Sequence, residues 1–308
     1  MLQRLHLIGT SALIFLAAVA CEKPMSDPTS PNHNPPIKTG IGPDGSAAAQ
    51  FAAVQHPTQD TAQVYGTYTR GCVAGAEQVA VSGPHWQVLN PARNRAWGHP
   101  VLVRFVKDLA VKVANDGHVG LLVGDLAQPR GGPLPSDHNS HQVGLDADIW
   151  LTPMPTKRLS LDELETFNPP SMVDITTMTT NRSFGVAQYS MLKHAAQSND
   201  VERIFVSPPI KRALCDRAGN RNSDWLRKIR PWRGHMAHMH VRLSCPPGSD
   251  DCKDQDPPPE GDGCGAELSS WLKDRTWASE SKGIYVPEKA IKVDGLPPEC
   301  KRILESNG

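Results

Sequence analysis

Apolar side chains recur with a helical period in one long segment of the chain. The segment covers residues 99–114, and its apolar positions are Leu102, Phe105, Val106, Leu109 and Val113. This spacing matches about 3.6 residues per turn, so one face of the segment is suited to packing against a core. Asn-Asp-Gly follows at residues 115–117 and is typical of a turn. We therefore predict an amphipathic helix over residues 99–114.

Two short apolar runs indicate buried strands. Residues 120–124 read Gly-Leu-Leu-Val-Gly, and residues 201–206 read Val-Glu-Arg-Ile-Phe-Val before Ser207 and two prolines. Proline cannot donate a hydrogen bond to a strand ladder, so the prolines mark the end of the second strand. Strands and helices do not alternate regularly, which favours the α+β class. We predict a central antiparallel sheet with flanking helices, and a loop-rich, disulfide-braced region from Pro246 onward.

Two further segments alternate between polar and apolar residues. The polar positions are Asp146 and Asp148 in residues 145–149, and His238, His240 and Arg242 in residues 238–243. A strand has a period of two, so each polar set shares one face of its strand. Gly144 lies between His141 and the first strand, where a turn or bulge would bring the histidine round to the carboxylates. Two such strands side by side would present a histidine, an aspartate and a second histidine to one ion.

Histidine and aspartate are concentrated in residues 136–148 and 234–240. These segments hold five of the chain's twelve histidines: His138, His141, His235, His238 and His240. Zn²⁺ accepts imidazole and carboxylate ligands, and three protein ligands with one open position are typical of catalytic zinc sites. The alternative for each segment alone is an exposed strand face with solvated or capping carboxylates. The presence of both segments favours a zinc site.

Both segments resemble those of a known peptidase family. HNSHQVGLDAD at residues 138–148 and WRGHMAHMHVRLSC at residues 232–245 are similar to the penicillin-insensitive murein endopeptidases. Lysostaphin-type peptidases, D-Ala-D-Ala metallopeptidases and the hedgehog signalling domain belong to the same superfamily, which shares the pattern His-x(6)-Asp followed by His-x-His. The likeness covers roughly residues 68 to 303, and the further similar segments are residues 70–76, 205–211, 225–232 and 261–267.

The resemblance implies a role for each residue of the pattern. The implied zinc ligands are His141, Asp148 and His240. His238 would act as the general base or stabilise the developing oxyanion, and His235 would lie around the metal site or beside the substrate. His138 also matches a histidine of the family's metal centre, as a ligand of a second ion or an alternative ligand. Downstream, this chain offers only Asp174 and no nearby histidine, which argues against a second metal site.

The implied activity is zinc-dependent, penicillin-insensitive cleavage of D-Ala–diaminopimelate cross-links in peptidoglycan. Zn²⁺ lowers the pKa of a coordinated water to about 7 and polarises the scissile carbonyl, so no nucleophilic side chain is required. One alternative is a D,D-carboxypeptidase or dipeptidase of the same superfamily, but those enzymes usually have a glutamate base where this chain has His238. A second alternative is a non-catalytic, zinc-bearing wall-binding module, against which His235 and His238 argue.

Two short motifs resemble those of serine-dependent penicillin-binding proteins. Ser190 and Lys193 form a Ser-x-x-Lys motif, and residues 38–40 read Lys-Thr-Gly. The second motif precedes the first and lies in a segment that looks disordered. Residues 189–197 look like an ordinary amphipathic helix with Ser190 and Lys193 one turn apart. We therefore expect no serine nucleophile.

Net charge and a few further side chains give weaker indications of function. Basic and acidic residues number 32 each, so nothing indicates a nucleic-acid partner. Four residues are candidates for lining a substrate cleft and meeting an anionic peptide, with a solvated surface as the alternative: Arg93, Arg95, Trp97 and His99. Three tryptophans near the metal motifs are expected to pack in the core: Trp150, Trp225 and Trp232.

The N-terminal part of the chain is predicted to export and anchor the protein. Residues 1–20 indicate a secretory signal peptide, because an arginine precedes an apolar run too short to cross a membrane. The run ends at a lipobox-like Ala-Val-Ala-Cys, so we expect Cys21 to carry a lipid; a plain cleavable signal is the alternative. Residues 21–60 are predicted to be a flexible tether, and residues 61–308 the metallopeptidase domain. We expect a periplasmic enzyme anchored to the outer membrane and acting on peptidoglycan.

Seven cysteines are an odd number for a secreted protein. If Cys21 carries lipid, six remain, and six cysteines allow fifteen pairings that spacing does not decide. Cys245 and Cys252 flank a short turn, which favours a local bridge. The family resemblance implies three bridges: Cys72–Cys300, Cys215–Cys264 and Cys245–Cys252. An oxidising periplasm is a compartment in which such bridges persist.

Overall fold

The fold is given by a computed structural model that describes residues 45–135, 138–219, 223–278 and 291–306. The chain divides into two units, residues 1–38 and 39–308. The predicted signal peptide, Cys21 and the Lys-Thr-Gly motif lie outside the described residues, and everything below concerns the second unit. Among the described residues, no helix is long and apolar enough to span a bilayer.

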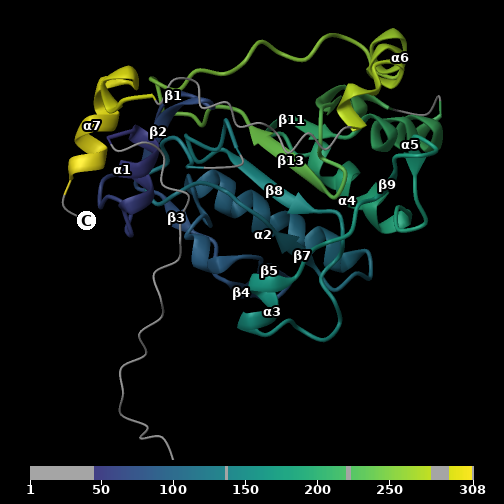
Figure 1. Cartoon of the computed structure of the whole chain (residues 1–308), viewed down its shortest axis with the longest axis horizontal. Helices are drawn as coiled ribbons and strands as arrows, with labels where there is room; N and C mark the ends of the chain where they lie inside the picture. The colour runs from purple at the N-terminus through teal and green to yellow at the C-terminus, as the bar shows by residue number, and fades with distance from the viewer. Residues whose placement is uncertain (1–44, 136–137, 220–222, 279–290, 307–308) are drawn as a thin grey trace, which may run out of the picture. The chain divides into compact units, whose positions relative to one another are not determined.

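A seven-stranded sheet forms the centre of the second unit (Figure 1). Its order is β12 (Ile229–Pro231), β11 (Val201–Val206), β13 (His238–Leu243), β8 (Asp146–Trp150), β7 (Leu121–Val123), β5 (Trp86–Val88) and β4 (Ser82–Gly83). Neighbouring strands are antiparallel except for β11 with β12 and β5 with β7, which are parallel. The α+β class is confirmed, and the sheet is mainly antiparallel rather than wholly so.

Three two-stranded sheets lie outside the central one. They pair β1 (Gln63–Thr67) with β2 (Arg70–Ala74), β3 (Glu77–Gln78) with β6 (Trp97–Gly98), and β9 (Val173–Asp174) with β10 (Thr179–Thr180). The shorter helical turns are η1 (Pro91–Arg93), η2 (Asp224–Lys228), η3 (Arg275–Ala278) and η4 (Val293–Gly295). Of these, η1 contributes a wall of the site described below.

The helices flank the sheets, as the sequence predicted. They are α1 (Ala47–Ala53), α2 (Pro100–Asn115), α3 (Leu161–Thr166), α4 (Val186–Ala196), α5 (Pro208–Ala218), α6 (Ala266–Lys273) and α7 (Pro298–Glu305). The helix predicted over residues 99–114 is α2, whose apolar face lies in the main core and packs against α4. His99 is its N-cap and accepts a hydrogen bond from the Val101 amide at 3.3 Å, with Pro100 at the first helical position.

The folded unit begins earlier than the sequence predicted. The expected tether ran to residue 60, yet α1 buries Ala47 and Phe51 against Cys300 and Ile303 of α7. Thr58 is buried and accepts a hydrogen bond from the Gly75 amide at 2.9 Å. Small residues at 45–50 resembled a linker in composition, but the buried Phe51, the Ser46 N-cap and a backbone hydrogen bond from Ala47 to Ile291 dock this short helix.

Three disulfides brace the unit, and their pairing confirms the one implied by the resemblance. Cys72–Cys300 joins β2 to α7, Cys215–Cys264 joins α5 to the segment before α6, and Cys245–Cys252 closes a loop after β13. Residues 246–265 contain no helix or extended strand, as expected for the loop-rich region. Cys215–Cys264 and Cys245–Cys252 therefore hold the chain where regular secondary structure is sparse, whereas Cys72–Cys300 joins two regular elements.

Candidate metal centre

The metal motifs meet where β8 and β13 lie side by side. The antiparallel register places His240 opposite Asp148, His238 opposite Trp150, and Arg242 opposite Asp146. Directly opposite residues project from the same face of an antiparallel pair, so the polar face predicted for each strand becomes one surface. Both strands are buried almost throughout, so this polar face is covered by the rest of the fold rather than exposed.

A bent loop brings His141 to the same surface. His141 and Gly144 both have a left-handed backbone, with φ of 66° and 67°. The His141 amide donates a hydrogen bond of 2.9 Å to Asp146, which holds the bend. The ring of His141 then lies 4.6 Å from the ring of His240, centroid to centroid. The turn expected near Gly144 is thus confirmed, and a side chain of the strand fixes it.

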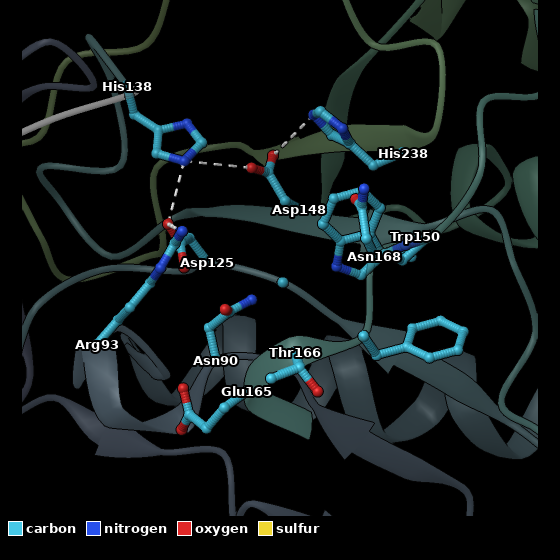
Figure 2. A pocket seen from close by; sticks show the side chains of 13 residues that line it. Asn90, Arg93, Asp125, His138, Asp148, Trp150, Glu165, Thr166, Asn168 and His238 are labelled. Carbon is cyan, nitrogen blue, oxygen red and sulfur yellow. Dashed lines mark hydrogen bonds and ion pairs between the residues drawn. The ribbon is translucent and has the colours of Figure 1, made fainter. Parts of the chain in front are cut away.

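Three candidate ligands converge among the described residues. One ligand atom each from His138, His141 and Asp148 lies within 4.8 Å of the others. The carboxylate oxygens of Asp148 are 3.6 Å from Nε2 of His138 and 3.6 Å from Nε2 of His141. Figure 2 shows the rings of His138 and His238 directed at the Asp148 carboxylate from two sides. This is the arrangement of side chains around a small cation.

Unpaired buried atoms test whether a metal ion fits. Both ring nitrogens of His141 and Oδ1 of Asp148 are buried without a hydrogen-bond partner. Burying such atoms unpaired is costly, and a metal ion would supply the missing partner. Burial alone would raise the pKa of Asp148, but the neighbouring His238, His141 and His138 bring it well below its usual value. The carboxylate is therefore ionised, and the donor set suits a borderline ion such as Zn²⁺.

His240 lies at the same centre and is oriented from behind by a buried ion pair. Its Nδ1 is 3.2 Å from Oδ1 of Asp148, and its Nε2 is 3.1 Å from Oδ1 of Asp146. Arg242 Nε donates to that Asp146 oxygen at 2.7 Å. With its proton on Nε2, His240 donates to Asp146 and keeps the lone pair of Nδ1 facing the centre. The role of His240 as third ligand stays a prediction.

Asp146 and Arg242 were recognised in the sequence only as residues on the polar faces. Burial would raise the pKa of Asp146, yet the charges of Arg242 and His240 lower it far below its usual value. Burial would lower the pKa of His240, but Asp146 and Asp148 raise it. The alternation of 238–243 placed Arg242 on the same face as His240, which was the available signal for this pairing.

Asp125 is a functional candidate that the sequence reasoning missed. Its Oδ2 lies 2.9 Å from Nη1 of Arg95, 3.2 Å from Nη1 of Arg93, and 3.2 Å from Nε2 of His138. Burial would raise its pKa, but the hydrogen bond from His138 and the two guanidinium charges lower it well below its usual range. Asp125 thus connects His138 to two arginines. It lies just beyond the end of β7, after Gly124, and no motif around it indicated such a role.

His238 and His235 lie beside the candidate ligands. Nε2 of His238 is 3.8 Å from Oδ1 of Asp148, and its ring packs edge-on against Trp150. The ring of His235 lies 4.9 Å from that of His238, and its Nδ1 is 2.7 Å from the Arg233 carbonyl oxygen. Burial lowers the pKa of both imidazoles, that of His235 strongly. Both rings are therefore neutral at neutral pH.

A cleft of about 390 Å³ opens beside the centre. His138, Asp148 and His238 form its upper wall in Figure 2, and Asn90, Arg93 and Glu165 lie on the other side. Of the four cleft candidates, Arg93 lines it. Arg95 is buried against Asp125, the Trp97 indole donates to Asn94, and His99 caps α2. The expectation for those three residues was wrong, because each has a structural contact away from the cleft.

The chain that carries this site is similar to proteins of a known family. A family model described as penicillin-insensitive murein endopeptidase matches residues 64–305. Proteins named "Penicillin-insensitive murein endopeptidase" are similar over most of their length. One from Pectobacterium atrosepticum is 41% identical over 260 residues, 84% of this chain and 90% of that protein. One from Escherichia coli O157:H7 is 40% identical over 265 residues, 85% of this chain and 93% of that protein. The chain belongs to the penicillin-insensitive murein endopeptidase family.

The tryptophans of this family member differ in their environment. Trp225 is buried in the core, as expected. Trp150 is half-buried and lines the cleft. Trp232 is 50% exposed, so the expectation of core packing was wrong for it. Its ring packs against Phe205, whose own ring lies 5.4 Å from that of His240.

The serine-type motif has no link to the centre of this murein endopeptidase family member. Ser190 lies on α4, and both its hydroxyl and the His194 ring bond to the Asp116 carboxylate at the end of α2. Because both side chains contact the same oxygen of Asp116, His194 is not arranged to take a proton from Ser190. Asp174 accepts hydrogen bonds from the Thr176 and Thr177 amides and caps a turn.

Proposed function

We propose that the protein is a zinc-dependent, penicillin-insensitive murein endopeptidase that cleaves D-Ala–diaminopimelate cross-links in peptidoglycan. One observation carries this proposal: the unpaired, buried atoms of His141 and Asp148 face each other at the end of an open cleft. Family membership and the names of the relatives support peptidoglycan as the substrate. The donor chemistry supports zinc.

Four side chains are available to hold the ion. His141, Asp148 and His240 would be the ligands, and His138 would be an additional or alternative one. When bound, Zn²⁺ supplies Lewis-acid activation of water and of the scissile carbonyl. Asp146 contacts the ring nitrogen of His240 that faces away from the centre, so this imidazole does not have to be ordered when the ion binds.

His238 would accept the proton of the attacking water and pass it to the leaving amine. Its side chain is 24% exposed, it lines the cleft, and burial keeps it neutral at neutral pH. A neutral imidazole accepts a proton as water attacks the amide and returns it to the leaving amine. The edge-on packing of Trp150 limits rotation of the ring. His235, whose ring lies 4.9 Å from that of His238, would lie around the metal site or beside the substrate.

The substrate class can be tested with two purified compounds. A cross-linked muropeptide dimer contains the internal D-alanyl amide, whereas an uncross-linked pentapeptide monomer carries only a C-terminal one. We expect cleavage of the dimer at an unchanged rate in saturating penicillin, and slow or no release of D-alanine from the monomer. Faster cleavage of the monomer would favour the D,D-carboxypeptidase alternative. Tight binding of either compound without cleavage would favour the wall-binding module.

We also propose that the enzyme is exported and anchored through lipid at Cys21. The apolar run in residues 1–20 and the following Ala-Val-Ala-Cys support this proposal. The three disulfides fit an oxidising compartment such as the periplasm. Metabolic labelling with a fatty acid would test it: we expect label on the wild type and none on Cys21→Ser. Label retained in Cys21→Ser would contradict the proposal.

A further inference from the structure

We propose that Arg93 binds a carboxylate of the peptide substrate, the free carboxylate next to the scissile cross-link amide. In a D-Ala–diaminopimelate cross-link, the carbon that carries the amide nitrogen also carries such a carboxylate. This inference rests on the proposed function and assigns Arg93 a role in the enzyme's specificity for its peptide substrate. It is drawn from the position, charge and hydrogen bonding of Arg93 in the cleft.

The charged side chains that line the cleft are mostly acidic, so an anionic substrate needs a positively charged side chain there. Among the described lining residues, three are carboxylic acids: Asp125, Asp148 and Glu165. Arg93 is the single lysine or arginine among them. A substrate carboxylate that enters this cleft beside the proposed ion would lie near these carboxylates, and a fixed positive side chain would offset their repulsion. Arg93 is the side chain able to do so.

Two arginines contact Asp125 beside the cleft, and they differ in exposure. Asp125 is one carboxylate shared by two guanidinium groups, those of Arg93 and Arg95. The side chain of Arg95 is 9% exposed, whereas that of Arg93 is 45% exposed. Of the two guanidinium groups, that of Arg93 is therefore the one that faces the cleft. Figure 2 shows its guanidinium beside Asp125, on the side of the cleft that leads to His138.

The hydrogen-bonding groups of Arg93 are only partly used. Its Nη1 contacts Asp125 at 3.2 Å. A guanidinium has five donors in a planar fork, so Nη2 and Nε can bind a carboxylate through two parallel bonds. Its distance from the centre is suitable as well: contacts of 3.2, 3.2 and 3.6 Å link Arg93, Asp125, His138 and Asp148 in series. An extended residue spans about 3.3–3.6 Å, so the guanidinium lies within about three residues of Asp148.

The backbone that carries Arg93 is held in place before any substrate binds. Asn90 and Asn94 flank η1 with left-handed conformations, at φ of 52° and 53°. The Ala92 amide donates a hydrogen bond of 2.8 Å to Glu165, which also lines the cleft. The Arg93 amide donates to the Asn90 carbonyl at 3.0 Å. Arg93 is thus a preorganised contact rather than a solvated surface side chain.

A matched pair of substrates tests this inference on the zinc-loaded enzyme. The probes are a cross-linked muropeptide dimer with the free carboxylate and the same dimer with that carboxylate converted to a carboxamide. We expect Arg93→Gln to lower kcat/KM for the carboxylate dimer on the order of 10- to 100-fold, chiefly through KM, and to leave the carboxamide dimer nearly unchanged. Arg93→Lys keeps the positive charge but loses the two parallel donors of the guanidinium. Its kcat/KM for the carboxylate dimer should lie between those of the wild type and Arg93→Gln.

Two further variants separate the substrate contact from other effects. Arg95→Gln also removes a partner of Asp125 but does not line the cleft, so it should affect both dimers equally. Arg212→Gln, exposed on α5, changes net charge by the same amount and should affect neither. Equal losses on both dimers in Arg93→Gln, or no loss on either, would overturn the inference. A wild type inactive on both dimers would overturn the proposed function and this inference with it.

Discussion

Two histidine–aspartate clusters in this protein have similar contact distances and different character. In the exposed cluster, His194 lies 2.8 Å from Asp116, and Ser190 bonds to the same carboxylate. In the buried cluster, His240 lies 3.2 Å from Asp148. The exposed groups satisfy one another, whereas His141 and Asp148 keep buried atoms without a partner. Buried ligand atoms without a hydrogen-bond partner, rather than a short contact between histidine and aspartate, therefore indicate where a metal ion would bind.

The largest effect should come from removing a ligand of the buried cluster. We expect Asp148→Ala and His141→Ala to lose both bound zinc and measurable cleavage, because each removes a donor from a buried site. Metal analysis and muropeptide cleavage would measure the two effects. His194→Ala removes a histidine from the exposed cluster and should keep zinc and activity at wild-type levels. Full zinc retention in both ligand variants would contradict the proposal that the buried cluster binds the ion.

Removal of the proposed base should have the next largest effect. We expect His238→Ala to reduce cleavage on the order of 10²–10⁴-fold while zinc stays bound, because a positioned acid–base group is lost and a ligand is not. Ser190→Ala is the control from the exposed cluster, and its rate should match the wild type. An active His238→Ala beside an inactive Ser190→Ala would instead support a serine mechanism.

The buried ion pair behind His240 should have an intermediate effect. Asp146→Asn keeps the shape of the side chain but removes the charge that orients His240 and pairs with Arg242. We expect zinc affinity to fall about 10- to 100-fold, as is typical when a partner behind a ligand is lost. Competition with a chelator would measure it. Asp174→Asn, which alters an exposed turn cap, should leave affinity unchanged; equal affinity in Asp146→Asn would contradict the proposed orientation of His240.

The smallest effect should come from the carboxylate of the exposed cluster. Asp116→Ala should lower the free energy of unfolding by about 0.2–1 kcal/mol, the range for exposed charge contacts. Hydrogen bonds from Ser190 and His194 lower the pKa of Asp116 below 3.8. Its contribution is therefore present above the unfolded-state pKa and is lost as pH falls through the lower, folded-state value. A difference from the wild type that grows in acid would contradict this reading.

Much of the fold could be predicted because its signals are local. The period of 3.6 in residues 99–114 marked α2 within one residue, and the alternation in 238–243 matched β13. The order of the sheet, with two parallel pairs, depends on contacts between distant segments and was not visible in any one of them. The start of the folded unit was missed for a similar reason: α1 is stabilised by α7, some 250 residues later in the chain.

The candidate site could be predicted as far as its motifs extend. His138, His141, Asp148, His238 and His240 come together as their pattern and the resemblance indicated. Asp125 could not be found, because it lies alone after a short strand and acts through tertiary contacts with Arg93, Arg95 and His138. The difference between Arg93 and Arg95 was likewise hidden: they are two positions apart, and only folding exposes one of them.

Zinc titration into metal-free wild-type enzyme tests the central claim most directly. Zinc would be removed with a chelator and returned in steps, while the conversion of cross-linked muropeptide dimers to monomers is followed. We predict no cleavage without metal and full recovery at about one equivalent of zinc, with or without penicillin, because one set of buried ligands binds one ion. Cleavage that persists in the metal-free enzyme, or that penicillin abolishes, would contradict it.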